Sequence, residues 1–126
     1  PYSYRGGVVD LLERHDEVSN TVQDLIFQRD QAKEFLYEEL AMAKDCEYKC
    51  SLIRAKIKTD GRNQSDRDNE LLLLLDGNEE YQVLFKESLE HRRSVNDATK
   101  NIELLNDGIK IGLSELQILA NLAQVN

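Results

Sequence analysis

Apolar side chains recur at alternating intervals of three and four residues through the first half of the chain. No Gly or Pro occurs in residues 8–58, so a single helix can run through this stretch. Twelve of the fifteen a and d positions of a seven-residue repeat are apolar or Cys, which is the pattern of a coiled-coil seam. We therefore predict one long helix over 8–58. Its seam positions are Val8, Leu11, His15, Val18, Val22, Leu25, Arg29, Ala32, Leu36, Glu39, Ala43, Cys46, Cys50, Ile53 and Ile57.

The clearest break in this pattern is the polar segment 59–65. Asp60-Gly61 is a turn signal, and Ser65 is a suitable N-terminal cap for a new helix. Acidic residues follow Ser65, where the positive end of the helix dipole favours them. We predict a turn over 59–65 and a short helix over 66–75.

The predicted short helix ends in five successive leucines, and a second break follows them. Leucines at 71–75 cover every side of a helix, so we expect this piece to be buried from several directions or against another subunit. Asp76-Gly77 interrupts the pattern, and Asp76 with Glu79 resembles a capping box. A further helix is therefore predicted to begin at residue 79.

A second seam runs along the proline-free stretch 79–125, where ten of thirteen a and d positions are apolar. Two long amphipathic helices of similar length, joined near the middle of the chain, predict an antiparallel hairpin. The predicted fold is all-α: one domain over 1–126 that forms a long coiled-coil-like hairpin with a short linking helix. The second seam comprises Tyr81, Leu84, Ser88, His91, Val95, Ala98, Ile102, Leu105, Ile109, Gly112, Leu116, Leu119 and Ala123.

The apolar positions exceed what one partner helix can cover, and a slim hairpin buries little surface per residue. We therefore expect a homo-oligomer. Gly108 and Gly112 share one helix face, where either a neighbouring backbone comes close or the helix kinks. The residues that widen the first seam are Leu12, Ile26, Phe35 and Leu40. The predicted oligomer interface comprises Leu71, Leu72, Leu74, Leu75, Gly108 and Gly112.

Charge and motifs narrow the class of protein. The 126 residues carry a net charge of −8, which argues against indiscriminate binding to nucleic acid or to an anionic membrane. No apolar run approaches the ~20 residues of a membrane span, and no signal peptide is visible. The chain has no Gly-rich phosphate loop and no HExxH, GxSxG or CxxC motif. We predict a protein that is not an enzyme and binds no cofactor.

One metal hypothesis competes with a purely structural interpretation. Cys46 and Cys50 lie four residues apart, and the predicted hairpin sets His91 close to them. Together with Glu87 or Glu90 they could bind zinc. The alternative is two reduced core thiols beside a partly exposed histidine, and we predict that no metal is bound.

A polar pair is predicted to fix the register of the two long helices. Arg29 falls on the first seam, opposite Asp107 on the second helix. A polar residue at a core position commonly sets register and partner choice at some cost in stability.

Basic residues gather before and within the predicted turn. Residues 44–67 hold seven basic and four acidic residues, a surplus of positive charge in a protein of net charge −8. This surplus either solvates a helix end or contacts the phosphates of a polyanion, because clustered Lys and Arg release counterions on binding.

The stretch SLIRAKIKTDGRN, the leucine-rich short helix and the long last helix together resemble a known family. They are similar to the UvsY-type recombination mediators of T4-type phages and to small helical proteins of phage and prophage recombination regions. The resemblance covers about residues 40–120. The matching pieces are Lys58-Thr59, Arg67, Leu75-Asp76 and Leu113-Ser114-Glu115-Leu116.

The resemblance implies a non-enzymatic oligomer that binds single-stranded DNA and helps to load a recombinase past the single-strand-binding protein, in the cytoplasm of a bacterial host. Its DNA-contact motif matches residues 53–56 with the basic pair in reversed order. Arg54 and Lys56 would then contact phosphates, assisted by Lys58 and Arg62. The alternative is an acidic helical adaptor, chaperone or DNA-mimicking inhibitor that binds protein and no nucleic acid.

Overall fold

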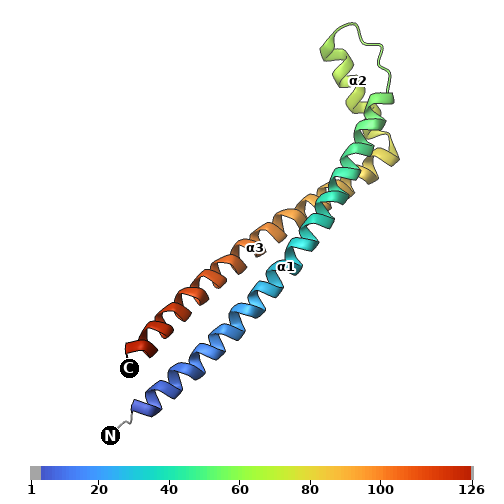
Figure 1. Cartoon of the computed structure of the whole chain (residues 1–126). Helices are drawn as coiled ribbons and strands as arrows, with labels where there is room; N and C mark the ends of the chain where they lie inside the picture. Colours follow the sequence, from blue (N-terminus) through green and yellow to red (C-terminus); the bar gives the residue numbers. More distant parts are fainter. Residues whose placement is uncertain (1–3, 126) are drawn as a thin grey trace. The chain divides into compact units, whose positions relative to one another are not determined.

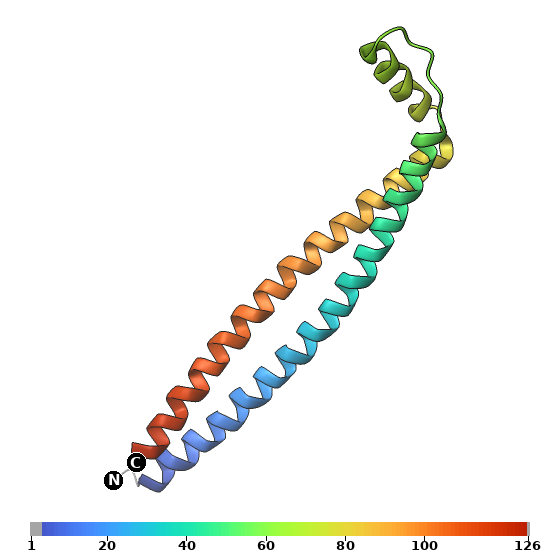
Figure 2. The same cartoon turned by 45° about the horizontal axis from the view of Figure 1, so that its top comes forward.

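The computed structural model describes residues 4–125 and, within them, the side chains of residues 9–124. This range forms three helices, α1 (Tyr4–Lys56), α2 (Gln64–Asp76) and α3 (Glu79–Val125) (Figures 1 and 2). Helix α1 packs against α3, so the predicted all-α hairpin is confirmed. The side chain of Val8, the first predicted seam position, lies outside the described ones.

Two compact units can be distinguished. Unit 1 contains residues 4–34 and 98–125, which are the N-terminal part of α1 and the C-terminal part of α3. Unit 2 contains residues 35–97, which are the rest of both long helices together with α2 and the loop over 57–63. Each unit has its own seam between α1 and α3.

Both heptad patterns describe the packing correctly. Every seam position with a described side chain, from Leu11 to Ile57 and from Tyr81 to Ala123, is buried or half-buried. The core of unit 1 consists of large aliphatic residues, whereas small residues dominate the buried positions of unit 2. The buried residues of unit 1 are Val18, Val22, Ala98, Ile109 and Leu119, and those of unit 2 are Ala43, Cys46, Cys50, Leu75 and Ser88.

Helix α1 ends at Lys56, two residues before the predicted boundary. The backbone N–H of Ile57 bonds to the carbonyl of Arg54 at 3.3 Å, which tightens the last turn. Arg54 and Lys56 lie in that turn, where the negative end of the helix dipole stabilises their positive charges.

Helix α2 begins at Gln64, two residues before the predicted start at residue 66. Asn63 is the N-cap, and its side-chain oxygen accepts the backbone N–H of Asp66 at 2.9 Å. Ser65, the predicted cap, is already helical. The prediction was wrong because Asn and Ser cap about equally well, and the sequence offers both.

Helix α3 begins at Glu79 as predicted, but with a different cap. Asn78 accepts the backbone N–H of Tyr81 through its side-chain oxygen at 2.8 Å. Asp76 is still the last residue of α2, so the predicted capping box at Asp76 is wrong. Gly77 ends α2 by donating its backbone N–H to the carbonyl of Leu73 at 3.2 Å.

The two glycines of α3 face α1 within unit 1. A Cβ atom at Gly112 would overlap Cγ2 of Val22, and one at Gly108 would lie 3.3 Å from Cδ1 of Leu25. Side chains of α1 therefore fill the space that the glycines leave, instead of the close backbone or the kink that we considered. The structure places both glycines, which we assigned to an oligomer interface, against the same chain.

We predict opposite effects of adding a methyl group at these two positions. Gly112→Ala should destabilise the protein by about 1–3 kcal/mol, because Val22 is β-branched and cannot rotate away. Gly108→Ala should be neutral or stabilising, because the flexible end of Leu25 can shift and Ala gains up to ~1 kcal/mol of helix propensity. Urea unfolding followed by circular dichroism measures both.

Val22→Ala provides the control for this comparison. In its background Gly112→Ala should no longer destabilise, because the overlapping methyl group is gone. An equal loss of stability in both backgrounds would show that the cost does not come from the contact with Val22.

Candidate binding surface at the loop of unit 2

The loop over 57–63 folds back onto the start of α2. A Cβ atom at Gly61 would lie 2.7 Å from the backbone N of Arg67, so only glycine fits there without a shift. The guanidinium of Arg67 donates to the carbonyl of Gly61 at 3.2 Å, and the carboxylate of Glu70 accepts the backbone N–H of Asp60 at 3.1 Å. Arg67 is therefore used to hold the loop on α2.

The four residues predicted to contact DNA are all exposed. Among the described side chains, those of Arg54, Lys56, Lys58 and Arg62 make neither a hydrogen bond nor an ion pair with the protein. Lys49, by contrast, is bound to Asp45 at 2.9 Å. The four cations are thus available to a ligand.

The acidic residues of α2 and of the start of α3 change the charge balance of this surface. Over residues 44–80 the chain has seven basic and nine acidic residues, so the positive surplus of 44–67 does not extend to the whole loop end. Glu79 and Glu80 lie in the first turn of α3, and Glu80 lines the same hollow as Lys56. The surface is therefore mixed in charge.

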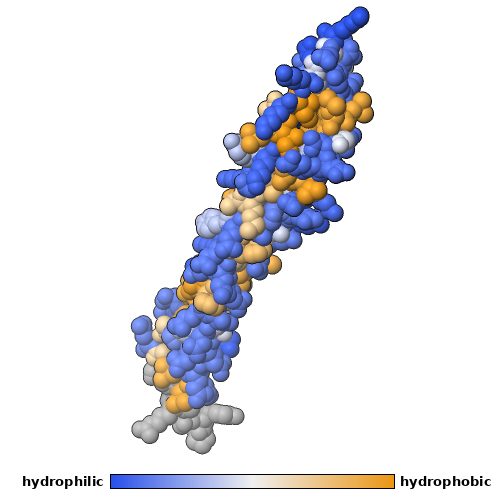
Figure 3. Space-filling model, turned by 90° about the vertical axis from the view of Figure 1, so that its right-hand side faces the viewer, coloured by the Kyte–Doolittle hydropathy of each residue, from blue (hydrophilic) through white to orange (hydrophobic). Residues whose placement is uncertain are grey.

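A groove runs along α1 and α3 beside the loop. It consists of two hollows of about 340 Å³ and about 440 Å³ that share Lys49 and Glu80. Apolar and charged side chains line it together, and Leu52 and Val83 are exposed apolar residues among them. Figure 3 shows apolar side chains gathered near the loop end of unit 2. The lining residues are Lys49, Leu52, Ile53, Lys56, Ile57 and Asn78 in the first hollow, and Glu79, Val83, Leu84 and Glu87 are added by the second.

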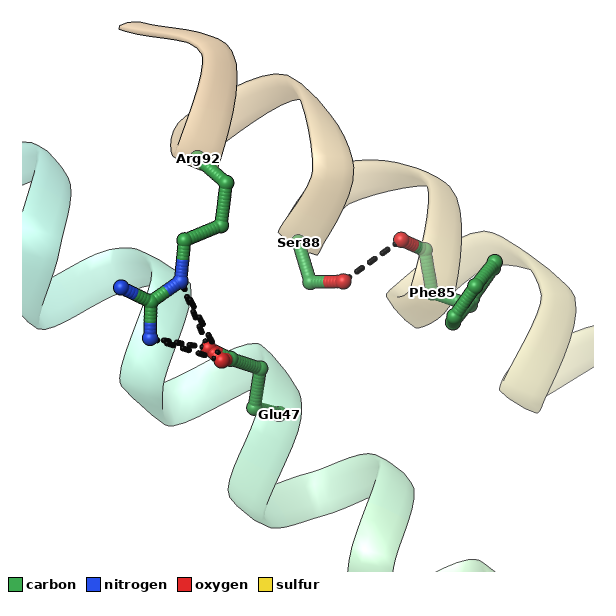
Figure 4. A network of polar contacts seen from close by, with 4 residues as sticks. All are labelled: Glu47, Phe85, Ser88 and Arg92. Atoms are coloured by element: carbon green, nitrogen blue, oxygen red, sulfur yellow. Dashed lines mark hydrogen bonds and ion pairs between the residues drawn. The ribbon is translucent and has the colours of Figure 1, made fainter. Parts of the chain in front are cut away.

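Polar pairs cross the seam of unit 2 next to the groove. The guanidinium of Arg92 binds both carboxylate oxygens of Glu47, with Nε–Oε1 at 2.8 Å and Nη2–Oε2 at 2.9 Å (Figure 4). The neighbouring His91 contacts the carboxylate of Glu39 through Nδ1, and Glu39 lies eight residues before Glu47 on α1. Both pairs link α1 to α3.

The leucine run of α2 divides into a buried and an exposed part. Leu75 is buried and Leu71 half-buried, whereas Leu72, Leu73 and Leu74 are exposed. Packing within the chain accounts for the burial of Leu75 and Leu71. The exposed leucines stay candidates for the predicted interface with another subunit.

Both residues of the predicted register pair, Arg29 and Asp107, lie in unit 1. The guanidinium of Arg29 donates to the side-chain oxygen of Asn106 at 3.4 Å and contacts Asp30 of its own helix at 3.4 Å. Asp107, the predicted partner, is exposed. A polar contact thus crosses the seam at this level, one residue away from the predicted one.

The cysteines sit on the seam of unit 2 as reduced thiols. Burial raises the pKa of Cys46 above its ordinary value, and the nearby carboxylate of Glu87 adds to the shift. Burial likewise raises the pKa of Cys50. The thiol of Cys46 donates to Glu87 at 3.8 Å, while His91 pairs with Glu39 instead. Within residues 4–125 no group of three or more His, Cys, Asp or Glu side chains is arranged to hold a metal ion.

Comparison with known proteins gives no further assignment. No protein-family model, no curated protein and no solved structure matches this chain. In the part of the chain that the structure describes, no helix is both long and apolar enough to span a bilayer.

Two features of the site were missed by sequence reasoning. The pairs Glu39–His91 and Glu47–Arg92 link the helices of unit 2, but only the first involves seam positions. Polar residues on a predicted seam were therefore a usable signal for the first pair. Glu47 and Arg92 flank the seam, so their pairing required the register to be known.

The raised pKa values predict a specific pH dependence of stability. A thiol with a raised pKa in the folded state stabilises the fold below its ordinary pKa of 9.0, and this contribution is lost as pH rises through the folded value. Between about pH 8 and about pH 10, wild type should lose more free energy of unfolding than the Cys46→Ala/Cys50→Ala variant. Urea unfolding at both pH values measures the difference.

The double variant serves as the control because it retains every ionisable side chain except the two thiols. A stability difference between the two proteins that does not change with pH would contradict the raised thiol pKa values.

Proposed function

We propose that this protein is a non-enzymatic adaptor that holds an amphipathic helix of a partner protein in the groove of unit 2. The observation that carries the proposal is the groove itself, in which exposed apolar residues lie between rims of opposite charge. Lys49 and Lys56 come from α1, and Glu79, Glu80 and Glu87 come from α3.

A helix is the occupant that this surface favours. Two helices packed side by side expose a long depression on each side of their seam, and a third helix fills such a depression with its apolar face. The charged rims then select the residues that flank the apolar face of the ligand, with acidic residues toward α1 and basic residues toward α3. Leu52 and Val83 would supply the apolar contacts.

A peptide-display library panned against the protein tests this function. We expect enrichment of amphipathic sequences with the charge pattern described, and binding of a labelled selected peptide measured by fluorescence anisotropy. Leu52→Gln combined with Val83→Gln should weaken that binding at least tenfold, because both residues are exposed and their replacement removes contacts with the ligand but not with the core.

Leu113→Gln is the matched control, since Leu113 is an exposed leucine of unit 1 and receives the same change. It should leave peptide binding unchanged. Failure to enrich any sequence, or equal binding by wild type and the groove variant, would rule out the adaptor function at this site.

A second candidate function is weak, sequence-independent binding of single-stranded DNA, as the resemblance to phage recombination mediators implies. One observation favours it: Arg54, Lys56, Lys58 and Arg62 are exposed and have no partner among the described side chains. In that role a recombinase or a single-strand-binding protein would be a further partner. The nine acidic residues of the same loop end oppose tight binding.

Anisotropy of labelled single-stranded DNA at two salt concentrations tests the second candidate. If DNA is a ligand, binding should weaken steeply with salt, and Arg54→Ala with Lys56→Ala should reduce both the affinity and the salt dependence. Lys33→Ala with Lys100→Ala, which removes the same charge from unit 1, should have a smaller effect. Absence of binding at low salt would exclude the second candidate and leave the first untouched.

A further inference from the structure

The chain contains three Asp-Gly dipeptides, at 60–61, 76–77 and 107–108. The side chains of Asp60, Asp76 and Asp107 are all exposed. Among the described residues, none of these three carboxylates takes part in a hydrogen bond or an ion pair. The three sites therefore share their dipeptide and their exposure, and they differ in the backbone that surrounds them.

An Asp-Gly dipeptide can cyclise without any other reactant. The backbone nitrogen of the glycine attacks Cγ of the protonated aspartate carboxyl, a five-membered succinimide ring closes, and one water leaves. Water then adds to one of the two ring carbonyls. Addition at Cγ restores aspartate, whereas addition at the main-chain carbonyl leaves isoaspartate, in which the backbone runs through Cβ and Cγ. Glycine favours ring closure because it has no Cβ to obstruct the approach of its nitrogen.

Helical hydrogen bonds protect two of the three dipeptides. Asp107 and Gly108 lie inside α3, where each backbone N–H donates to the carbonyl four residues earlier. Asp76 is the last residue of α2, and Gly77 donates its N–H to the carbonyl of Leu73 at 3.2 Å. Cyclisation at either place must first break such a hydrogen bond and rotate the backbone out of the helical conformation.

Asp60-Gly61 lies in the loop between α1 and α2 and lacks this protection. The N–H of Gly61 makes no hydrogen bond within the described part of the chain. The carboxylate of Glu70 accepts the N–H of Asp60 at 3.1 Å, and the guanidinium of Arg67 donates at 3.2 Å to the carbonyl of the next residue. These two contacts lie on either side of the reacting groups. The carboxyl of Asp60 and the nitrogen that attacks it are thus both unbound.

We propose that Asp60 is a site of spontaneous isomerisation, at which the folded protein accumulates isoaspartate. The isomerised backbone is one atom longer, and Gly61 sits where even an added Cβ would lie 2.7 Å from the backbone N of Arg67. The longer loop cannot keep this packing, so its contacts with Arg67 and Glu70 are lost and the loop separates from α2. The inference is independent of the adaptor function, because it requires no ligand in the groove.

Peptide mapping of protein incubated at about pH 6 tests the proposal, because the reacting carboxyl must be protonated and the protonated fraction falls as pH rises. Isoaspartate is counted by methyl transfer from S-adenosylmethionine with an isoaspartyl methyltransferase. Mass spectrometry locates it as a peptide of unchanged mass and altered retention. Isoaspartate should form at residue 60 at least about tenfold faster than at 76 or 107, because those two sites react only after local opening of their helices.

Asp60→Glu is the matched control, since it keeps the negative charge but would have to close a larger ring. It should form no isoaspartate at residue 60 and leave the slow reaction at Asp76 and Asp107 unchanged. In urea, wild type should react at similar rates at all three dipeptides, because unfolding removes the difference between their backbones. Hydrogen exchange over residues 57–67 should be faster in the isomerised protein than in fresh protein.

Three results would overturn the proposal. Equal rates at the three dipeptides of the folded protein would show that the backbone does not select Asp60. If residue 60 stays intact in the folded protein while the chain in urea isomerises, the contacts with Arg67 and Glu70 hold the loop away from the geometry of ring closure. Unchanged hydrogen exchange after isomerisation would show that the loop remains on α2.

Discussion

Everything in this structure depends on the contact between α1 and α3. Each long helix has only the other as a long partner within the described chain, so a side chain either reaches the seam or faces outward. A two-helix hairpin has no second layer in which to bury what remains. This constraint explains why large apolar residues such as Leu73, Leu104 and Ile111 stay exposed, although every described seam position is buried or half-buried.

The polar contacts across the seam contribute more to register than to stability. Both side chains of the Glu47–Arg92 pair are about 40% exposed, so the bidentate ion pair contributes at most about 1 kcal/mol. Arg29–Asn106 in unit 1 and Glu39–His91 in unit 2 lie nearer the core, where a slipped register would leave a polar group buried without its partner. The apolar seam tolerates such a slip more readily, because small and aliphatic side chains can exchange places with little specificity.

The sequence predicted the fold well because a heptad seam requires only local periodicity. The two lists of seam positions were correct wherever side chains are described, and α3 began where it was expected. Cap identity was less predictable, since Asn63 competes with Ser65 and Asn78 with Asp76 over a few residues. Both are differences of about 1 kcal/mol or less.

Predictions that required knowledge of the facing helix succeeded less often. The space beside Gly112 is filled by Val22, which is ninety residues away in the sequence and is identified only once the register is fixed. The positive surplus of 44–67 was a property of the chosen window, because folding brings Glu80 of α3 beside Lys56 and Glu70 of α2 onto the loop. The division of the leucine run at Leu75 also depends on packing that periodicity cannot show.

The loop held by Gly61 and Arg67 makes the entropy cost of helix pairing different at the two ends of the hairpin. Contacts of unit 2 such as Glu47–Arg92 join residues 45 positions apart, whereas Arg14–Glu115 in unit 1 joins residues 101 positions apart. Closing the longer loop from an unfolded chain costs about 0.7 kcal/mol more in entropy, so loop closure by itself favours pairing of the helices beside the loop over pairing near the termini. If the backbone were cut at residues 57–63, the two long helices would belong to separate chains. Their pairing would then be a bimolecular association, and its rate would depend on concentration.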